Sequence, residues 1–128
     1  MIEKLIKNYE DFHDALVLNV EYKTNIDLSN GIYKTGVIEV ILVISCFNRL
    51  KENERETIKI KLSEVEEFRY IKYDGMIMDT FIKKENDFYI IDFDPIIDTD
   101  KNGEWINKKN LNSALSIRFK NIFYEIIE

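Results

Sequence analysis

The single histidine of this chain, His13, stands next to Asp14 and is the side chain best suited to proton transfer near neutral pH. An imidazole beside a carboxylate is part of an acid–base arrangement, but covalent catalysis also needs an activated nucleophile. The chain has no Gly-x-Ser-x-Gly elbow, and its only cysteine, Cys46, lies in an apolar run that favours a buried thiol. Two interpretations stay open. Either Phe12 fills the core while His13 and Asp14 hydrogen-bond the backbone, or the pair acts directly in binding or catalysis.

Asp92 and Asp94 form a second candidate group, because side chains two residues apart on a strand share a face. With Asp79 on a neighbouring strand, they would make a carboxylate cluster suited to acid–base chemistry or to Mg²⁺. Carboxylates on the solvent-facing side of an edge strand explain the same pattern. A zinc site built on two or more histidines is excluded, since His13 is the only one.

A segment further along the chain matches the opening of an EF-hand calcium loop. The matching residues are Asp98, Asp100, Asn102 and Gly103. The twelfth position should be a bidentate glutamate, but it is Lys109, which would bring positive charge to the ion. The flanking segments are strand-like rather than helical. An acidic loop that turns at Asn102-Gly103 is therefore the favoured interpretation, with weak Ca²⁺ binding as the alternative.

Trp105 is the only tryptophan and follows Glu104 in an otherwise polar stretch. Its indole either covers one end of the core or stays exposed as an anchor for a protein partner, because tryptophan is enriched at the energetic centre of interfaces. The acidic segment around it would suit a basic partner. The candidate partner-binding residues are Asp94, Asp98, Asp100, Glu104 and Trp105.

The elements that must position these side chains follow from hydrophobic periodicity. Residues 2–10 place apolar side chains on one side at helical spacing, which predicts a short amphipathic helix. From residue 16 onward the period is mostly two, and the first strand should present four side chains to one face: Leu16, Leu18, Val20 and Tyr22. Residues 37–47 are apolar on both sides, which predicts a central strand covered on both faces. The pattern indicates an α+β fold, predominantly antiparallel β, with about seven or eight strands in a curved sheet or sandwich and a short N-terminal helix.

Length and charge limit the function classes. The chain has 128 residues and no Pro-rich, Gly-rich or low-complexity linker, which predicts a single domain over residues 1–128. A formal net charge of −6 argues against binding to a nucleic-acid backbone and fits docking onto a basic protein. The longest apolar stretch is too short to cross a bilayer, and the N-terminus lacks the features of a signal peptide. The cytoplasm is the expected location, with no membrane contact, and no cofactor is indicated.

Several short motifs follow one another in an order that resembles a bacterial family. These motifs are Phe12-His13-Asp14-Ala15, the segment 58–69, Met76-Ile77-Met78-Asp79 and Tyr89-Ile90-Ile91-Asp92-Phe93. From about Asp11 to the C-terminus, the chain resembles immunity-protein-50-like proteins, found near polymorphic toxin genes, and related uncharacterised FHD families. The resemblance implies a β-rich protein that neutralises a toxin by binding it, and it carries over no catalytic residues.

Three functions from different classes are compatible with these observations. The favoured one is non-enzymatic protein binding. Its specific form is immunity, in which the chain would bind and neutralise a basic toxin domain. The second is a small ligand-binding domain or enzyme, which would need an enclosed cavity where His13 meets Asp14, Asp92 or Asp94. The third is a self-associating structural protein whose exposed strand edges pair in a symmetric homodimer.

Overall fold

The computed structural model describes residues 2–31, 34, 36–72 and 75–127. Strands make up 55% of it and helices 12%, so the expected mostly β, antiparallel fold with a short N-terminal helix is confirmed. The helical elements are α1 (Ile2–Asn8) and three 3₁₀ turns, η1 (Glu10–Phe12), η2 (Ser29–Gly31) and η3 (Arg49–Lys51). The strands are β1 (Ala15–Lys23), β2 (Glu39–Asn48), β3 (Glu54–Ser63), β4 (Glu67–Tyr70), β5 (Met76–Ile77), β6 (Phe81–Glu85), β7 (Phe88–Asp92), β8 (Ile96–Thr99), β9 (Trp105–Lys108), β10 (Leu115–Phe119) and β11 (Asn121–Ile126).

The described part of the chain has eleven strands, more than the seven or eight predicted. The difference comes from short pairings where the sequence shows no long alternating run. β5 has two residues, and β8 and β9 have four each. The segment favoured as an acidic loop is therefore a turn between two short paired strands.

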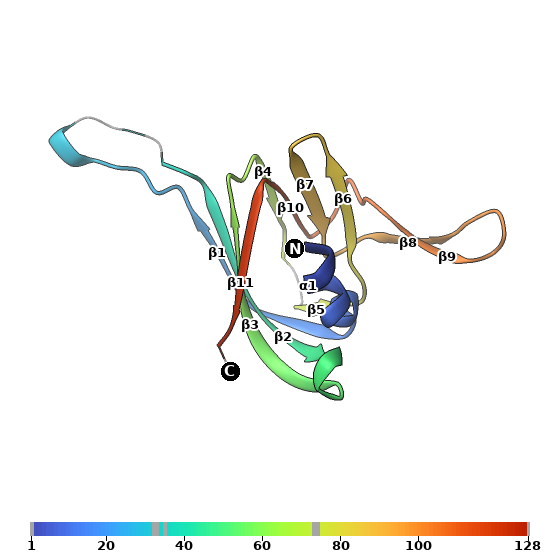
Figure 1. Cartoon of the computed structure of the whole chain (residues 1–128). Coiled ribbons are helices and arrows are strands. Elements are labelled where there is room, and N and C mark those ends of the chain that lie inside the picture. Colours follow the sequence, from blue (N-terminus) through green and yellow to red (C-terminus); the bar gives the residue numbers. More distant parts are fainter. Residues whose placement is uncertain (1, 32–33, 35, 73–74, 128) are drawn as a thin grey trace.

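Two antiparallel sheets enclose the core (Figure 1). The larger has the strand order β11-β3-β2-β1-β5, and the smaller has the order β4-β10-β7-β6. The chain passes between the sheets from β3 to β4, from β4 to β5, from β5 to β6 and from β10 to β11. The first and the last of these crossings are joined by backbone hydrogen bonds, 2.8 Å from Glu66 N to Arg118 O and 3.2 Å from Lys120 N to Ser63 O. The two sheets are thereby connected at a common corner.

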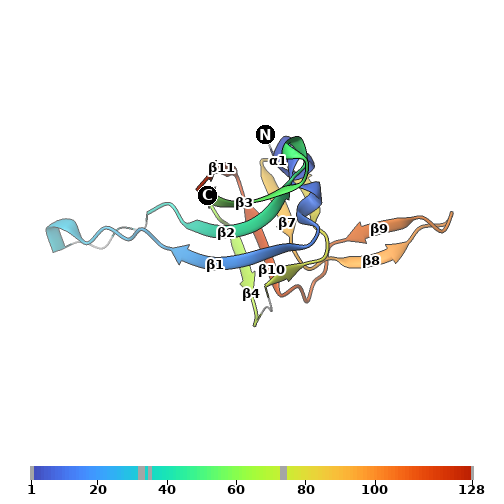
Figure 2. The same ribbon diagram turned by 90° about the horizontal axis from the view of Figure 1, so that it is seen from below.

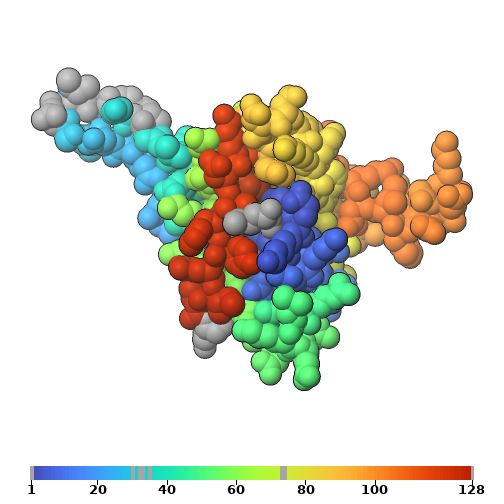
Figure 3. Space-filling view, in the orientation of Figure 1, coloured from blue at the N-terminus to red at the C-terminus, as the bar shows by residue number. Residues whose placement is uncertain are grey.

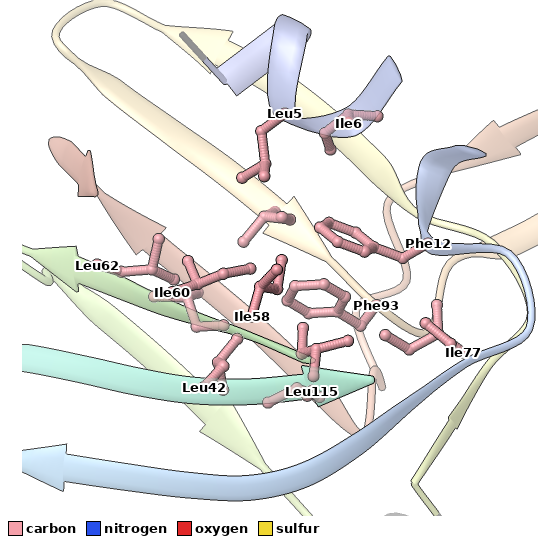
Figure 4. Close-up of a cluster of buried hydrophobic side chains, with 14 of the residues drawn as sticks. Leu5, Ile6, Phe12, Leu42, Ile58, Ile60, Leu62, Ile77, Phe93 and Leu115 are labelled. Carbon is pink, nitrogen blue, oxygen red and sulfur yellow. The ribbon is translucent and has the colours of Figure 1, made fainter. Parts of the chain in front are cut away.

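α1 packs its apolar side onto the core between the sheets (Figure 4). Ile2, Leu5 and Ile6 are buried, and so is Tyr9 just after the helix. The predicted helix over residues 2–10 is thus present, but it ends at Asn8. Phe12 follows in η1 and is fully buried beside Phe93, with ring centroids 6.0 Å apart. The helix and the turn after it close the core.

β1 does not present its four apolar side chains to one face, and that prediction is wrong. The register against β2 shifts between Val17 and Asn19, which marks a β-bulge at Leu18. An extra residue reverses the alternation, since side chains on a strand have a period of two. Val17 and Val20 therefore pack against the core, whereas Leu18 is 57% exposed.

β2 is the central strand of the larger sheet. Its inward side chains are fully buried: Val40, Leu42, Ile44 and Cys46. The outward side of β2 was expected to be covered as well. Among the described residues, side chains of the neighbouring strand cover it, rather than a further layer of structure. The Arg55 guanidinium lies 4.2 Å from the centre of the Phe47 ring, and Lys61 pairs with Glu39 at 2.9 Å beside Ile41. Long charged side chains cover apolar neighbours with their stems.

Two arms project from the body in opposite directions (Figures 2 and 3). One is made by the described residues between β1 and β2, where Asp27 and Lys34 form an isolated bridge. The other is the β8–β9 hairpin, a separate two-stranded sheet over residues 96–108. Within the described ranges, no helix is long and apolar enough to cross a membrane.

Candidate functional site

His13 is exposed at the corner between η1 and β1, although Phe12 before it is buried. Its Nδ1 lies 2.5 Å from the carbonyl oxygen of Met78, and its Nε2 lies 3.5 Å from Asp14 Oδ2. The hydrogen bond to Met78 raises the pKa of His13 above its ordinary value, as does the charge of Asp14, while desolvation acts in the opposite direction. These contacts match the interpretation in which Phe12 fills the core and His13 bonds the backbone at the corner.

The turn that carries His13 has an uncommon backbone conformation. Four of its non-glycine residues have φ between 54° and 59°: Glu10, Asp11, Phe12 and Asp14. The left-handed region costs a residue with a Cβ about 1–2 kcal/mol. Burial of the Phe12 side chain, worth about 1.5–3 kcal/mol, offsets part of this cost. A 2.8 Å hydrogen bond from Thr80 Oγ1 to the Asp11 carbonyl also holds the turn, so His13 and Asp14 have a fixed position.

The surface beside His13 is a shallow depression and not an enclosed cavity. It has a volume of about 380 Å³, and its lining includes Glu10, His13, Asp14 and Phe47. The ligand-binding hypothesis expects His13 to meet carboxylates inside a cavity. Of the three carboxylates that this hypothesis names, only Asp14 lies beside His13, and both side chains are more than half exposed. The depression therefore lacks the enclosure that this hypothesis requires.

Asp92 lies inside the molecule, and the expectation of a solvent-facing carboxylate is wrong. β7 is an inner strand of the smaller sheet, and Asp92 is fully buried at its end. Its Oδ1 accepts hydrogen bonds from Ser113 Oγ at 2.6 Å and from Asp94 N at 2.9 Å. Its Oδ2 accepts one from Asn110 N at 2.8 Å, with Lys109 Nζ at 3.8 Å. Several donors thus satisfy this carboxylate, as a buried charge requires.

The predicted cluster of Asp79, Asp92 and Asp94 does not form. Asp79 lies near Asp11 instead, where its charge adds to the effect of burial and raises the pKa of Asp11. Asp94 Oδ2 accepts a 3.0 Å hydrogen bond from the backbone of Ala114, which fixes the chain where the hairpin begins. No group of three or more His, Cys, Asp or Glu side chains in the described ranges could hold a metal ion. Asp92 and Asp94 act in folding the segment around residues 109–114.

Asp100 folds the tip of the β8–β9 hairpin. Its Oδ1 accepts hydrogen bonds from the backbone of Asn102 at 2.8 Å and of Glu104 at 3.0 Å. Gly103, with φ of 78°, donates to the Asp100 carbonyl at 3.0 Å. Asp98 is held by the Thr99 backbone and by Lys108 at 3.2 Å. The EF-hand-like residues therefore build the favoured turn, and the carboxylates of Asp98 and Asp100 are bonded to donors within the hairpin.

The hairpin has two chemically different faces, because residues directly opposite across a strand pair share a face. Asp98 pairs with Ile106, whereas the next residue, Thr99, pairs with Trp105. One face, here called the acidic face, carries Ile96, Asp98, Ile106 and Lys108, and alternation adds Glu104 to it. The other, the tryptophan face, carries Ile97, Thr99, Trp105 and Asn107. Trp105 and Asp98 thus point in opposite directions.

Both faces of the hairpin leave apolar side chains in water. Trp105 is 77% exposed, so the interpretation of its indole as a cover for the core is wrong. Ile96 is 46% exposed on the acidic face, and Ile97 is 48% exposed on the tryptophan face. Figure 3 shows the outer part of the arm projecting from the body. Nearer its base, on the tryptophan face, Asn107 Nδ2 donates a 3.4 Å hydrogen bond to the Thr80 carbonyl.

The hairpin gathers four of the five candidate partner-binding residues and leaves out the fifth. Asp98, Asp100, Glu104 and Trp105 are on it, while Asp94 lies before β8. Sequence reasoning missed the exposed Ile97 on the tryptophan face, although the alternation from Ile96 to Thr99 carried the signal. Comparison with protein-family models, with curated proteins and with solved structures gives no match for this chain.

Proposed function

We propose that the chain is a non-enzymatic protein-binding domain that docks through its β8–β9 hairpin and neutralises a bacterial toxin as an immunity protein. The observation that carries the binding role is the exposure of Trp105, 77%, on an arm that projects from the body. An isolated two-stranded hairpin is marginally stable in water. Bare apolar side chains on such an arm are a feature of surfaces that a partner covers.

The chemistry of the hairpin supports a protein as the partner. Tryptophan is among the residues that contribute most to protein interfaces, because its large ring loses little conformational entropy on burial. The turn is pre-formed by Asp100, so the arm needs little ordering when it binds. A rigid arm with one exposed indole is therefore suited to seat an anchor in a partner's pocket.

The toxin is the more specific part of the proposal. The resemblance to immunity proteins supports it, and so does the net charge of −6, since an acidic inhibitor associates rapidly with a basic toxin domain. The proposed compartment is the cytoplasm, where thiols stay reduced. Cys46 is unpaired and buried, and its burial raises the pKa of the thiol to about 12. A thiol of this kind is inert, which fits that compartment.

The non-enzymatic part rests on the use of the carboxylates. Asp92 and Asp94 are bound by backbone and side-chain donors that fold the neighbouring loop. The depression at His13 is open, and Asp14 is the carboxylate that contacts the imidazole. A general acid or base must reach a bound substrate, and neither place offers one an enclosed position.

The test compares full-length wild-type protein with Trp105→Ala and with a matched control, Leu50→Ala. Leu50 is exposed to a similar extent but lies on η3, in the body. Each tagged protein is used to capture partners from host extract, with identification by mass spectrometry. Each is also co-expressed with any toxin that a neighbouring gene encodes. We expect Trp105→Ala alone to lose the captured protein and the protection against the toxin.

Each part of the proposal has its own contrary result. Equal capture by all three proteins would show that the hairpin is not the docking element. Capture that depends on Trp105, without protection against any neighbouring toxin, would leave a protein-binding domain and remove the immunity role.

A further inference from the structure

The two faces of the β8–β9 hairpin constrain how a partner can hold it, and this inference rests on the proposed function. Ile96 on the acidic face and Ile97 on the tryptophan face are exposed to nearly the same extent, 46% and 48%. A partner lying flat on one face would leave the other isoleucine in water. The distribution of apolar surface therefore favours contact on both faces.

The size of the hairpin leads to the same result. β8 and β9 contribute four residues each, so each face has four strand side chains. A stable protein interface uses roughly 20–30 residues on each partner. One face of this arm falls far short of that number. Contact on both faces doubles what the arm supplies, and the rest of the interface has to come from residues outside β8 and β9. The projecting shape leaves room for a partner on either side (Figure 2).

The charges on the acidic face indicate what one side of the partner must carry. Asp98 is paired with Lys108 at 3.2 Å, and the Asp100 carboxylate is bound by the turn. Glu104 is exposed, and within the described part of the chain neither Lys101 nor Lys108 forms an ion pair with it. On this face, Glu104 is thus the carboxylate that remains free to form an ion pair with a partner.

We propose that the hairpin inserts as a wedge into a cleft of a partner protein, with an apolar wall against Trp105 and Ile97 and an arginine or lysine opposite Glu104. The tryptophan face supplies the buried anchor, and an ion pair at Glu104 fixes the orientation. This arrangement covers both isoleucines and uses the only unpaired carboxylate among the described strand and turn residues of the arm.

The experiment measures affinity with one variant set for each face. The probe is the protein that the wild-type chain retains from host extract, purified and titrated against full-length variants by surface plasmon resonance. Trp105→Ala tests the tryptophan face, while Ile96→Ser, Glu104→Gln and Glu104→Lys test the acidic face. Glu125→Gln is the matched control, an exposed carboxylate on β11. Circular dichroism establishes that every variant is folded.

We expect Trp105→Ala and Glu104→Lys each to weaken binding at least about tenfold. Ile96→Ser should weaken it by a smaller factor, and Glu104→Gln should also reduce the dependence of affinity on salt. Glu125→Gln should bind as the wild type does. Agreement of both variant sets supports the wedge.

Three results would overturn it. Loss of binding for Trp105→Ala alone means that the partner lies on one face, which removes the wedge and keeps the proposed function. Unchanged binding for every variant removes both. A concentration-dependent dimer in light scattering, abolished by Trp105→Ala, would make a second copy of this chain the occupant of the hairpin instead.

Discussion

The hydroxyl of Tyr9 donates a 2.8 Å hydrogen bond to Oε2 of Glu56, a carboxylate that is almost completely buried. Asn48 Nδ2 donates to the same oxygen at 2.9 Å, and Lys51 Nζ lies 2.7 Å from Oε1. Burial of Glu56 opposes its charge, but the hydrogen bonds from Lys51, Tyr9 and Asn48 outweigh that effect and lower its pKa. This ionised carboxylate connects the end of α1 to β3 and to the loop around η3.

Tyr9→Phe should lower the free energy of unfolding by about 1.5–3 kcal/mol, since it removes a donor to a buried charge. Urea denaturation followed by circular dichroism measures the change. Tyr22→Phe is the matched control, because Tyr22 is nearly half exposed and stacks on Phe68 through its ring. A loss for Tyr9→Phe no larger than that of the control would mean that Glu56 does not depend on this hydroxyl.

His13 should make the protein more stable at mildly acidic pH than at mildly alkaline pH. Its folded-state pKa is raised above the ordinary 6.5, chiefly by the hydrogen bond to the Met78 carbonyl. A raised pKa means that the folded state binds the proton more tightly. The stabilisation is therefore complete below pH 6.5 and is lost as the pH rises through the folded-state pKa.

Because His13 is the only histidine, its imidazole NMR signals give that pKa without assignment, and we expect a value above 6.5. His13→Gln should flatten the dependence of unfolding free energy on pH across this interval. A measured pKa at or below 6.5, or an unchanged pH dependence in His13→Gln, would contradict the bond to Met78.

The elements with strong periodicity were predictable because their burial is decided locally. The helix near residues 2–10 and the strand near residues 58–62 each follow from apolar side chains at regular spacing. The bulge at Leu18 was not predictable, because it is a property of the register between β1 and β2. One extra residue then moved Leu16 and Leu18 away from the face of Val20.

The environment of the carboxylates depended on contacts that are distant in sequence. In the sequence, Asp92 looks like a solvent-facing polar residue on an alternating strand. In the structure its carboxylate is buried and accepts hydrogen bonds from Asn110 and Ser113. No local pattern indicates such donors. On the hairpin, by contrast, the period of two was enough to predict that Asp98 and Thr99 lie on opposite faces. Only the pairing of Thr99 with Trp105, which places the indole on the face of Thr99, had to come from the structure.

Asp92→Asn should lower the free energy of unfolding by about 1–3 kcal/mol, because an amide nitrogen would face a donor where a carboxylate oxygen now accepts. Either rotamer of the amide sets its NH₂ group against a backbone N–H, that of Asn110 or that of Asp94. Asp87→Asn, in the exposed turn between β6 and β7, is the control and should change little. Equal stability of the two variants would mean that the buried site does not need the negative charge.

Trp105→Ala should change the free energy of unfolding by less than about 0.5 kcal/mol, as expected for a surface position without structural contacts. Its indole is 77% exposed, and Asp100 holds the hairpin turn without it. Phe119→Ala provides the contrast, because Phe119 is fully buried and its truncation should cost about 3–5 kcal/mol.

Fluorescence gives an independent reading, since Trp105 is the only tryptophan. Its emission in the folded protein should already be that of an indole in water and should shift little on unfolding in urea. A large shift, or a stability loss for Trp105→Ala close to that of Phe119→Ala, would mean that the indole packs on the body. In that case the hairpin would be a structural element, and its tryptophan could not serve as the anchor for a partner.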